Sequence, residues 1–196
     1  MTYIGIIVSF IFINNIILDQ LLVGKSFLDV TRNTRAAVSF GIILICVSAI
    51  SCFFTWTVYH GLLKPVNLEY LQTLLFIIVV TSLTLIIEFL LDKIFPALHR
   101  YIKEFFPLVA ANCAVLGISL ISVRSGYTAG ESFAAGGAAG AGYFLAIILL
   151  SAIQESSKRE WVPRPFQGIP VTLISAGLMA LAFMAFDNAL LKNLIG

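Results

Sequence analysis

Residues 107–117 read PLVAANCAVLG, an apolar stretch with a proline at its start and a single amide, Asn112, at its centre. The neighbouring residues extend it to a hydrophobic run over Phe105–Val123, which is about long enough to cross a bilayer. An amide in hydrocarbon must find hydrogen-bond partners, and a broken helix survives at membrane depth only when protein buries it or it lines a cavity. We therefore expect two half-helices that meet at Asn112.

The whole chain has the composition of a membrane protein. Of its 196 residues, 60% are hydrophobic and only 11% are charged, whereas an ordinary globular domain has about 25% charged residues. The mean hydropathy is +1.01. A net charge of +2, with no basic arm or acidic tail, gives no footprint for nucleic acid. The composition predicts the lipid bilayer as the solvent and excludes a soluble catalytic domain.

Six apolar runs have about the length of a membrane span, and we predict an all-α integral membrane protein with six transmembrane helices. The amino-terminal run lacks a basic leader and a small-residue cleavage site, so we interpret it as a retained span and not as a signal peptide. The predicted spans are Ile4–Val23, Ala36–Tyr59, Tyr70–Leu91, Phe105–Val123, Ser132–Ile153 and Gly168–Leu191.

The basic residues of the connecting loops predict an orientation. Three basic residues lie in each loop that follows an odd-numbered span, and a single one follows each even-numbered span. The first group is Lys25, Arg32, Arg35, Lys93, Arg100, Lys103, Lys158, Arg159 and Arg164, and the second is Lys64, Arg124 and Lys192. Because positive residues collect on the cytoplasmic side, we expect both termini outside the cytoplasm.

The two halves of the chain have the same order of spans. Asn15 and Asn112 lie 97 positions apart, and a shift by this distance places the second and third spans on the fifth and sixth. Each half then holds an odd number of spans, so the second copy is inverted relative to the first. Inverted repeats of this kind place a functional site near the membrane midplane. We predict a single membrane domain over 1–196, with repeats 1–98 and 99–196.

Asparagine residues mark the matching positions of the two repeats. Asn14 and Asn15 lie in the first span, and Asn112 lies in the fourth. One hypothesis is that both spans are broken into half-helices there, and the other is that each asparagine joins two ordinary helices. Cys113 follows the predicted break, where it is a plausible thiolate ligand or a small inert hydrophobic side chain.

Three acidic residues near the ends of spans are candidates for ion coupling. Glu88 lies late in the third span, Glu155 ends the fifth, and Asp19 follows the asparagine pair in the first. A carboxylate within a span is a functional hypothesis by default, with ion coordination or proton handling as its role. The alternative is an interfacial residue paired with a nearby cation, Lys93 for Glu88 and Lys158 for Glu155.

The sequence offers no catalytic residue. His60 and His99 fall in predicted loops without a partner at metal-ligand spacing, and no Ser/His/Asp set can be assembled. Residues 136–142 are rich in glycine, but no Gly-Lys-Ser/Thr follows them, so this is no phosphate loop. Small residues at this spacing favour close helix packing. We expect a subunit that is not catalytic alone.

These motifs resemble the RnfA/NqrE family. Residues 107–117 match its P-L-x-x-x-N-C-A-V-L-G motif, and the likeness is collinear over nearly the whole chain. The family comprises the A subunit of the Rnf electron-transport complex and the E subunit of the sodium-pumping NADH:quinone reductase. The further matches are Asn14 and Asn15 with Leu18, Glu88, Ala152–Glu155 and Ile174–Met184.

The resemblance implies a fold, a partner and a cofactor. It implies six spans in an inverted repeat, paired in the bacterial inner membrane with a homologous subunit of the RnfE/NqrD type. A two-iron, two-sulfur cluster would lie between them, held by two cysteines from each subunit. Electrons would cross the membrane through it, coupled to Na⁺ or H⁺ transport. Flavin, nicotinamide and ferredoxin sites would belong to subunits of the RnfB, RnfC, RnfD and RnfG types, and not to this chain.

One position departs from the family pattern. Cys113 carries over as a cluster ligand, but the second cysteine belongs to an L-G-x-C-P-F motif, where residues 23–27 here read VGKSF. This stretch is one residue shorter than the motif, and with the gap at the x position Lys25 stands in place of that cysteine. Iron–sulfur clusters are held by thiolates. Our main hypothesis is a membrane subunit of an Rnf-type ion-translocating ferredoxin:NAD⁺ oxidoreductase. The alternative is a small inverted-repeat transporter or scaffold subunit without a redox cofactor.

Overall fold

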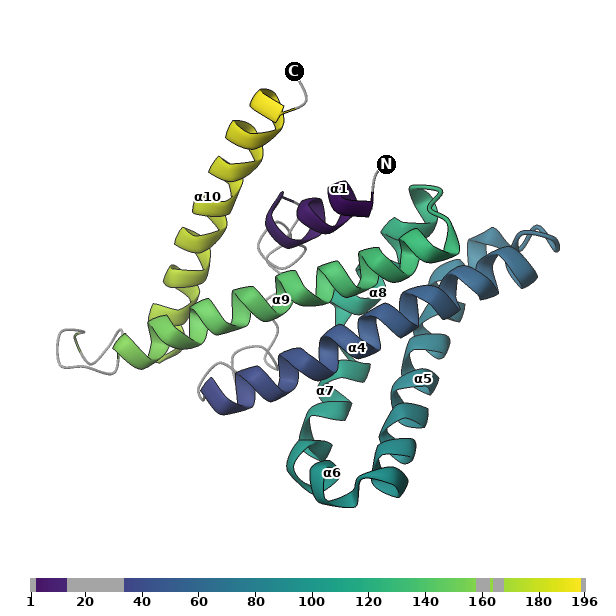
Figure 1. Ribbon diagram of the computed structural model, residues 1–196, viewed down its shortest axis with the longest axis horizontal. Coiled ribbons are helices and arrows are strands. Elements are labelled where there is room, and N and C mark those ends of the chain that lie inside the picture. The colour runs from purple at the N-terminus through teal and green to yellow at the C-terminus, as the bar shows by residue number, and fades with distance from the viewer. Residues whose placement is uncertain (1–2, 14–33, 158–162, 164–167, 195–196) are drawn as a thin grey trace.

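The computed structural model describes residues 3–13, 34–157, 163 and 168–194. Within these ranges all regular structure is helical (Figure 1). The helices are α1 (Tyr3–Val8), η1 (Ser9–Ile13), α4 (Thr34–Val58), η2 (Tyr59–Leu63), η3 (Glu69–Leu71), α5 (Gln72–Ile94), α6 (Pro96–Ile102), η4 (Lys103–Phe105), α7 (Phe106–Ala110), α8 (Cys113–Arg124), α9 (Ala129–Ser157) and α10 (Ile169–Leu194).

Several of these helices are long and apolar enough to cross a membrane. Three continuous ones cover Ala36–Leu63, Glu69–Ile94 and Ala129–Ser156. A fourth span results if the bent pair α7 and α8 is counted as one. Helix α10 has 26 residues. The described part of this membrane protein is therefore all-helical, and half of the predicted first span, residues 14–23, lies outside the described residues.

The helix ends differ from the predicted ones by up to about one turn. The second span was predicted to end at Tyr59, but the helix continues through η2 to Leu63. The fifth was predicted to begin at Ser132, but α9 begins at Ala129, where Glu131 accepts hydrogen bonds from Thr128. The contacts between Thr128 and Glu131 satisfy backbone groups of the first turn of α9, so this helix begins before the apolar residues that define its span.

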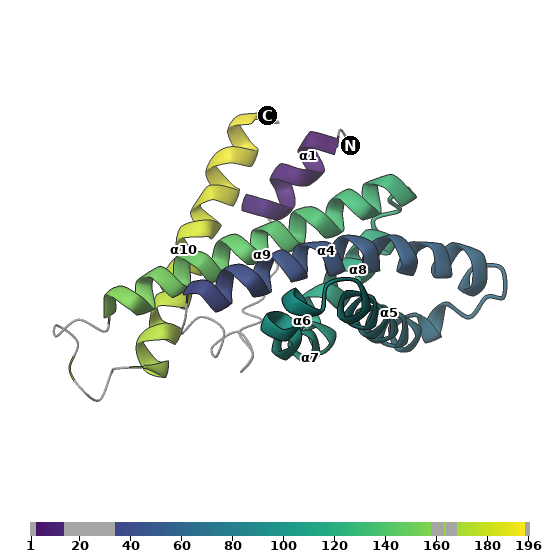
Figure 2. The same ribbon diagram turned by 60° about the horizontal axis from the view of Figure 1, so that its bottom comes forward.

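Helices α4 and α9 form the centre of the protein, where they lie side by side and run in opposite directions (Figures 1 and 2). A Cβ atom on Gly140 would lie 2.7 Å from the Cα atom of Ile45, so only glycine fits there. At Gly136 a Cβ atom would lie 2.6 Å from the carbonyl oxygen of Ser48. The glycine-rich stretch is thus a packing motif that lets two backbones approach closely.

The other long helices flank this central pair. Helix α5 packs against α4, α10 packs against α9, and the two lie on opposite sides of the pair (Figure 1). Helix α8 contacts both α4 and α9. Of the most apolar 18 residues in the span Glu69–Ile94, only 17% are buried, against 50% in the spans Ala36–Leu63 and Ala129–Ser156. Helix α5 is therefore peripheral, and most of its surface is left for lipid or for another protein.

Candidate functional site

The fourth predicted span is broken between Ala110, where α7 ends, and Cys113, where α8 begins. The two helices are bent by 47°. Asn112 has an extended backbone, and its side chain accepts a hydrogen bond of 2.9 Å from the backbone nitrogen of Ala114. Asparagine is among the best residues for capping a helix in this way. The local sequence therefore explains why a new helix begins at Cys113.

The break is tied to the central helix pair. Tyr143 of α9 is only 4% exposed, and its side chain is a hydrogen-bond partner of the Asn112 side chain. A cavity of about 10 Å³ adjoins this contact, which is near the smallest volume that holds one water molecule. It is lined by Leu44, Ser48, Ala114, Val115, Ala139, Gly140 and Tyr143. Asn112 thus fixes both the start of α8 and its position against α9.

Cys113 is exposed on the surface of the chain, although it lies in the middle of the bent pair that spans Lys103–Arg124. The two residues that follow, Ala114 and Val115, are buried. Cys113 is also the first residue of α8. At about mid-span the thiol is therefore accessible to a neighbouring protein. The buried Cys52 instead contacts Ser119, and Cys46 is exposed on α4.

Replacing Asn112 by alanine should destabilise the break. The variant loses the cap of α8, which costs about 1 kcal/mol, and removes a partner of the buried Tyr143 hydroxyl, which costs about as much again. We expect a lower midpoint of thermal unfolding for the purified protein in detergent. Asn112→Ser is the control because serine retains a capping oxygen. An unchanged midpoint in Asn112→Ala would contradict this role.

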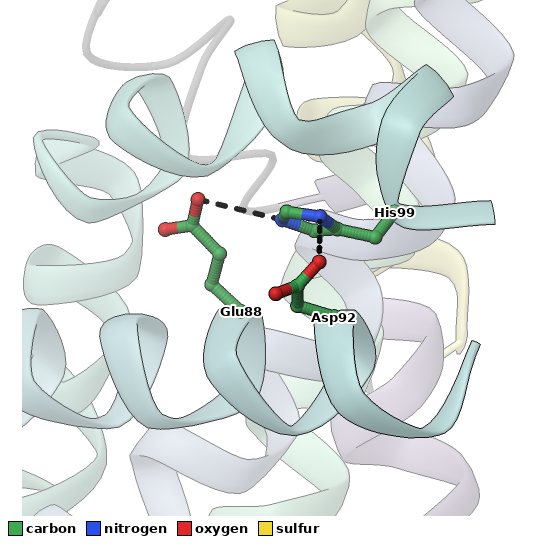
Figure 3. A network of polar contacts seen from close by, with 3 residues as sticks. All are labelled: Glu88, Asp92 and His99. Atoms are coloured by element: carbon green, nitrogen blue, oxygen red, sulfur yellow. Dashed lines mark ion pairs between the residues drawn. The ribbon is translucent and has the colours of Figure 1, made fainter. Parts of the chain in front are cut away.

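Glu88 belongs to a second polar cluster, at the turn between α5 and α6 (Figure 3). The imidazole of His99 lies between two carboxylates. Its Nδ1 atom is 2.9 Å from Oδ1 of Asp92, and its Nε2 atom is 3.7 Å from Oε1 of Glu88. Glu88 and Asp92 are four residues apart and so share a helix face. Pro96 opens α6, which folds back and brings His99 over that face.

This cluster corrects two predictions. His99 was predicted to lie in a loop, but it lies in α6, where its imidazole contacts both acids. Glu88 was predicted to pair with Lys93 if it was interfacial, yet its ion pair is with His99, and the Nζ atom of Lys93 lies 6.0 Å from the centre of the Phe89 ring. The sequence contains part of the signal for this cluster. The four-residue spacing of Glu88 and Asp92 places both acids on one helix face, and Pro96 marks the start of the next helix.

The remaining candidates do not join either cluster in the described structure. Oε2 of Glu155 accepts a hydrogen bond of 3.0 Å from Oγ1 of Thr34, which ties the end of α9 to the start of α4. Asn14, Asn15, Asp19 and Lys25, as well as Lys158, lie outside the described residues. In the part of the chain that the structure describes, no group of three His, Cys, Asp or Glu side chains could hold a metal ion.

Comparison with known proteins assigns the chain to a family. The model of the family "Rnf-Nqr subunit, membrane protein" matches residues 3–190. The chain is 37% identical to the A subunit of the Na⁺-translocating ferredoxin:NAD⁺ oxidoreductase complex of Acetobacterium woodii, over 96% of this chain and 98% of that protein. It is 38% identical to the E subunit of the Na⁺-translocating NADH-quinone reductase of Pseudoalteromonas translucida, over 95% and 97%.

A third relative is the A subunit of the ion-translocating oxidoreductase complex of Syntrophotalea carbinolica. It is 37% identical over 92% of this chain and 94% of its own length. The matches thus extend over nearly the full length of every one of these proteins, and the family model covers both α4 and α9 as well as the break at Asn112. The chain therefore belongs to the Rnf-Nqr family of membrane-protein subunits.

Proposed function

We propose that this chain is the A-type membrane subunit of an Rnf-type ion-translocating ferredoxin:NAD⁺ oxidoreductase. In this role it passes electrons across the bacterial inner membrane and couples them to the movement of Na⁺ or H⁺. The observation that carries the proposal is the nearly full-length match to the A subunit of such a complex in Acetobacterium woodii. The exposed Cys113 at the broken span supports it, because a cysteine side chain there is accessible to an electron carrier shared with a neighbouring protein.

The proposed architecture has six spans in two inverted repeats, with half-helices in the first and fourth spans and both termini outside the cytoplasm. Three features of the structure support it. Helices α4 and α9 occupy matching places in the two repeats and are antiparallel, and each is followed by a flanking helix on its own side of the pair. The fourth span is broken at the asparagine that corresponds to Asn15.

The residues at the break fit part of an iron–sulfur site. Cys113 fits one ligand position, because it is exposed at mid-span and begins a helix. Lys25 does not fit the second, since clusters of two irons and two sulfurs are held by thiolates or, in some proteins, imidazoles. We therefore propose that this chain provides one cysteine ligand and that a homologous subunit of the RnfE/NqrD type provides others. When bound, such a cluster supplies a one-electron carrier.

Lys25 stands in place of the cysteine that the family pattern has, and this difference also favours a second candidate function, a transporter or scaffold subunit without a redox cofactor. In the main proposal the flavin, nicotinamide and ferredoxin sites lie on other subunits. The two differ in whether ion movement requires electrons.

The purified complex distinguishes the two candidates. A tag on this chain should co-purify an assembly of several different subunits, and vesicles containing it should form NADH from reduced ferredoxin and NAD⁺ while they move cations. The same assembly prepared without this chain should do neither. If cations move at the same rate without reduced ferredoxin, the transporter is the correct function. If NADH formation and ion movement both survive removal of the chain, the main proposal is wrong.

A further inference from the structure

The cluster of Glu88, Asp92 and His99 connects the surface of the protein with a deeper position on α5. Asp92 is 61% exposed, whereas His99 is 16% exposed and Glu88 is 28% exposed. Glu88 lies one helical turn further from the end of α5 than Asp92. The imidazole lies between the two carboxylates, with one ring nitrogen directed at each (Figure 3). The three side chains thus form a short polar path from the surface into the span.

One atom of this path calls for an explanation. Nε2 of His99 is buried and has no hydrogen-bond partner among the residues that the structure describes. A buried polar atom without a partner costs about 1–3 kcal/mol. The carboxylate of Glu88 lies 3.7 Å away, slightly beyond hydrogen-bond distance. A small rotation of the Glu88 side chain would close this gap and let Nε2 exchange a proton with Glu88.

The chemistry of imidazole suits this position. One ring nitrogen binds a proton while the other releases one, which lets a histidine side chain act as a proton shuttle. In one transfer, the O–H bond of a protonated Asp92 breaks and an Nδ1–H bond forms. The Nε2–H bond then breaks and an O–H bond forms on Glu88. One proton has moved from Asp92 to Glu88, and the starting tautomer returns when Nδ1 releases its proton and Nε2 takes one up.

We propose that Asp92, His99 and Glu88 form a proton relay between the membrane surface and the span of α5. The proposal rests on the proposed function and deepens it, because it assigns protons as ions that this subunit handles. Under the proposed orientation, the relay opens on the cytoplasmic side, since α5 ends in the loop that carries Lys93, Arg100 and Lys103.

The charged groups around His99 are consistent with this role. Helix α6 packs against α5 and η4. Helix α5 contributes Glu88, Asp92 and Lys93, η4 contributes Lys103 and Glu104, and α6 itself contributes Arg100. Lys103, Glu104 and Arg100 are exposed, and Lys93 lies over the Phe89 ring. In the described part of the chain, the ion pairs of His99 are with the two acids of the relay, and the ring of Phe106 lies 6.3 Å from its own.

The test uses the whole complex in vesicles that contain a pH-sensitive dye. We expect His99→Gln to lower redox-driven proton movement by about tenfold or more, because glutamine can hydrogen-bond Asp92 but cannot relay a proton. His99→Ala should show the same loss, and added imidazole should restore its proton movement. His60→Gln is the matched control, since His60 stacks on Trp56 and contacts neither acid. It should behave like the wild type.

The other outcomes overturn either the relay or the proposed function. Undiminished proton movement in His99→Gln would do so directly. A loss in His99→Ala that imidazole does not restore would assign His99 a structural role. A wild-type complex that moves Na⁺ with electron transfer, but no protons, would overturn the relay and leave the proposed function intact. A wild-type complex without any redox-driven ion movement would instead show that the proposed function is wrong.

Discussion

Cys113→Ser is expected to remove iron and acid-labile sulfide from the purified complex and to slow electron transfer by about a hundredfold or more. Loss of a residue that only supports a metal ligand already costs up to about a hundredfold, so loss of the ligand itself should cost at least as much. Serine has nearly the shape of cysteine but does not provide a thiolate. The fold should therefore survive, because Cys113 is exposed and Asn112 still caps α8.

Two further variants complete this measurement. Cys46→Ser is the matched control, because Cys46 is likewise exposed but lies on α4, away from the helix break. It should retain the iron content of the wild type. Lys25→Cys restores the ligand pattern that the family resemblance implies and should raise the iron content. If Cys113→Ser retains its iron, Cys113 has no part in holding a cluster.

Gly140→Ala is expected to destabilise the protein by about 1–3 kcal/mol, the usual cost of overpacking a tight contact. The added Cβ atom would lie 2.7 Å from the Cα atom of Ile45. A backbone atom cannot move aside as a flexible side chain can, so α4 and α9 must separate. We expect a lower yield of assembled complex and a lower midpoint of thermal unfolding. A double variant with Gly136→Ala should be worse, since its Cβ atom meets the Ser48 carbonyl oxygen.

Gly137→Ala provides the control on the same helix. Its Cβ atom would lie 3.7 Å from that of Ala49, which is ordinary van der Waals contact. Alanine also has a higher helix propensity than glycine, by up to about 1 kcal/mol. This variant should be as stable as the wild type or more so. Equal stability of Gly140→Ala and Gly137→Ala would show that the two helices are not held at the distance described.

The sequence predicted features that depend on local chemistry. Apolar runs predict helices in lipid because every backbone polar group must be satisfied within the segment, and α4, α5 and α9 follow that rule. The amide of Asn112 within such a run indicated where the helix is broken, because asparagine caps helices well. The glycines at 136 and 140 were interpreted as a packing motif, and the close approach of α4 confirms this.

Features that depend on tertiary contacts were not predicted. The approach of His99 to Glu88 and Asp92 depends on the direction in which α6 folds back from α5, which no periodicity specifies. The contact of Tyr143 with Asn112 joins residues on separate helices, and in the sequence Tyr143 is one more aromatic residue of an apolar span.

The length of α9 links the protein to the thickness of its membrane. Its 29 residues extend for about 44 Å, because each residue of an α-helix adds about 1.5 Å. The hydrocarbon layer of a typical bilayer is only about 30 Å thick. Helix α9 must therefore tilt or project into the headgroups. Helix α4 must tilt with it, because the close contacts at Gly136 and Gly140 hold the two helices together. A thinner or thicker bilayer would consequently change the angle of this pair, and with it the depth of the kink at Asn112.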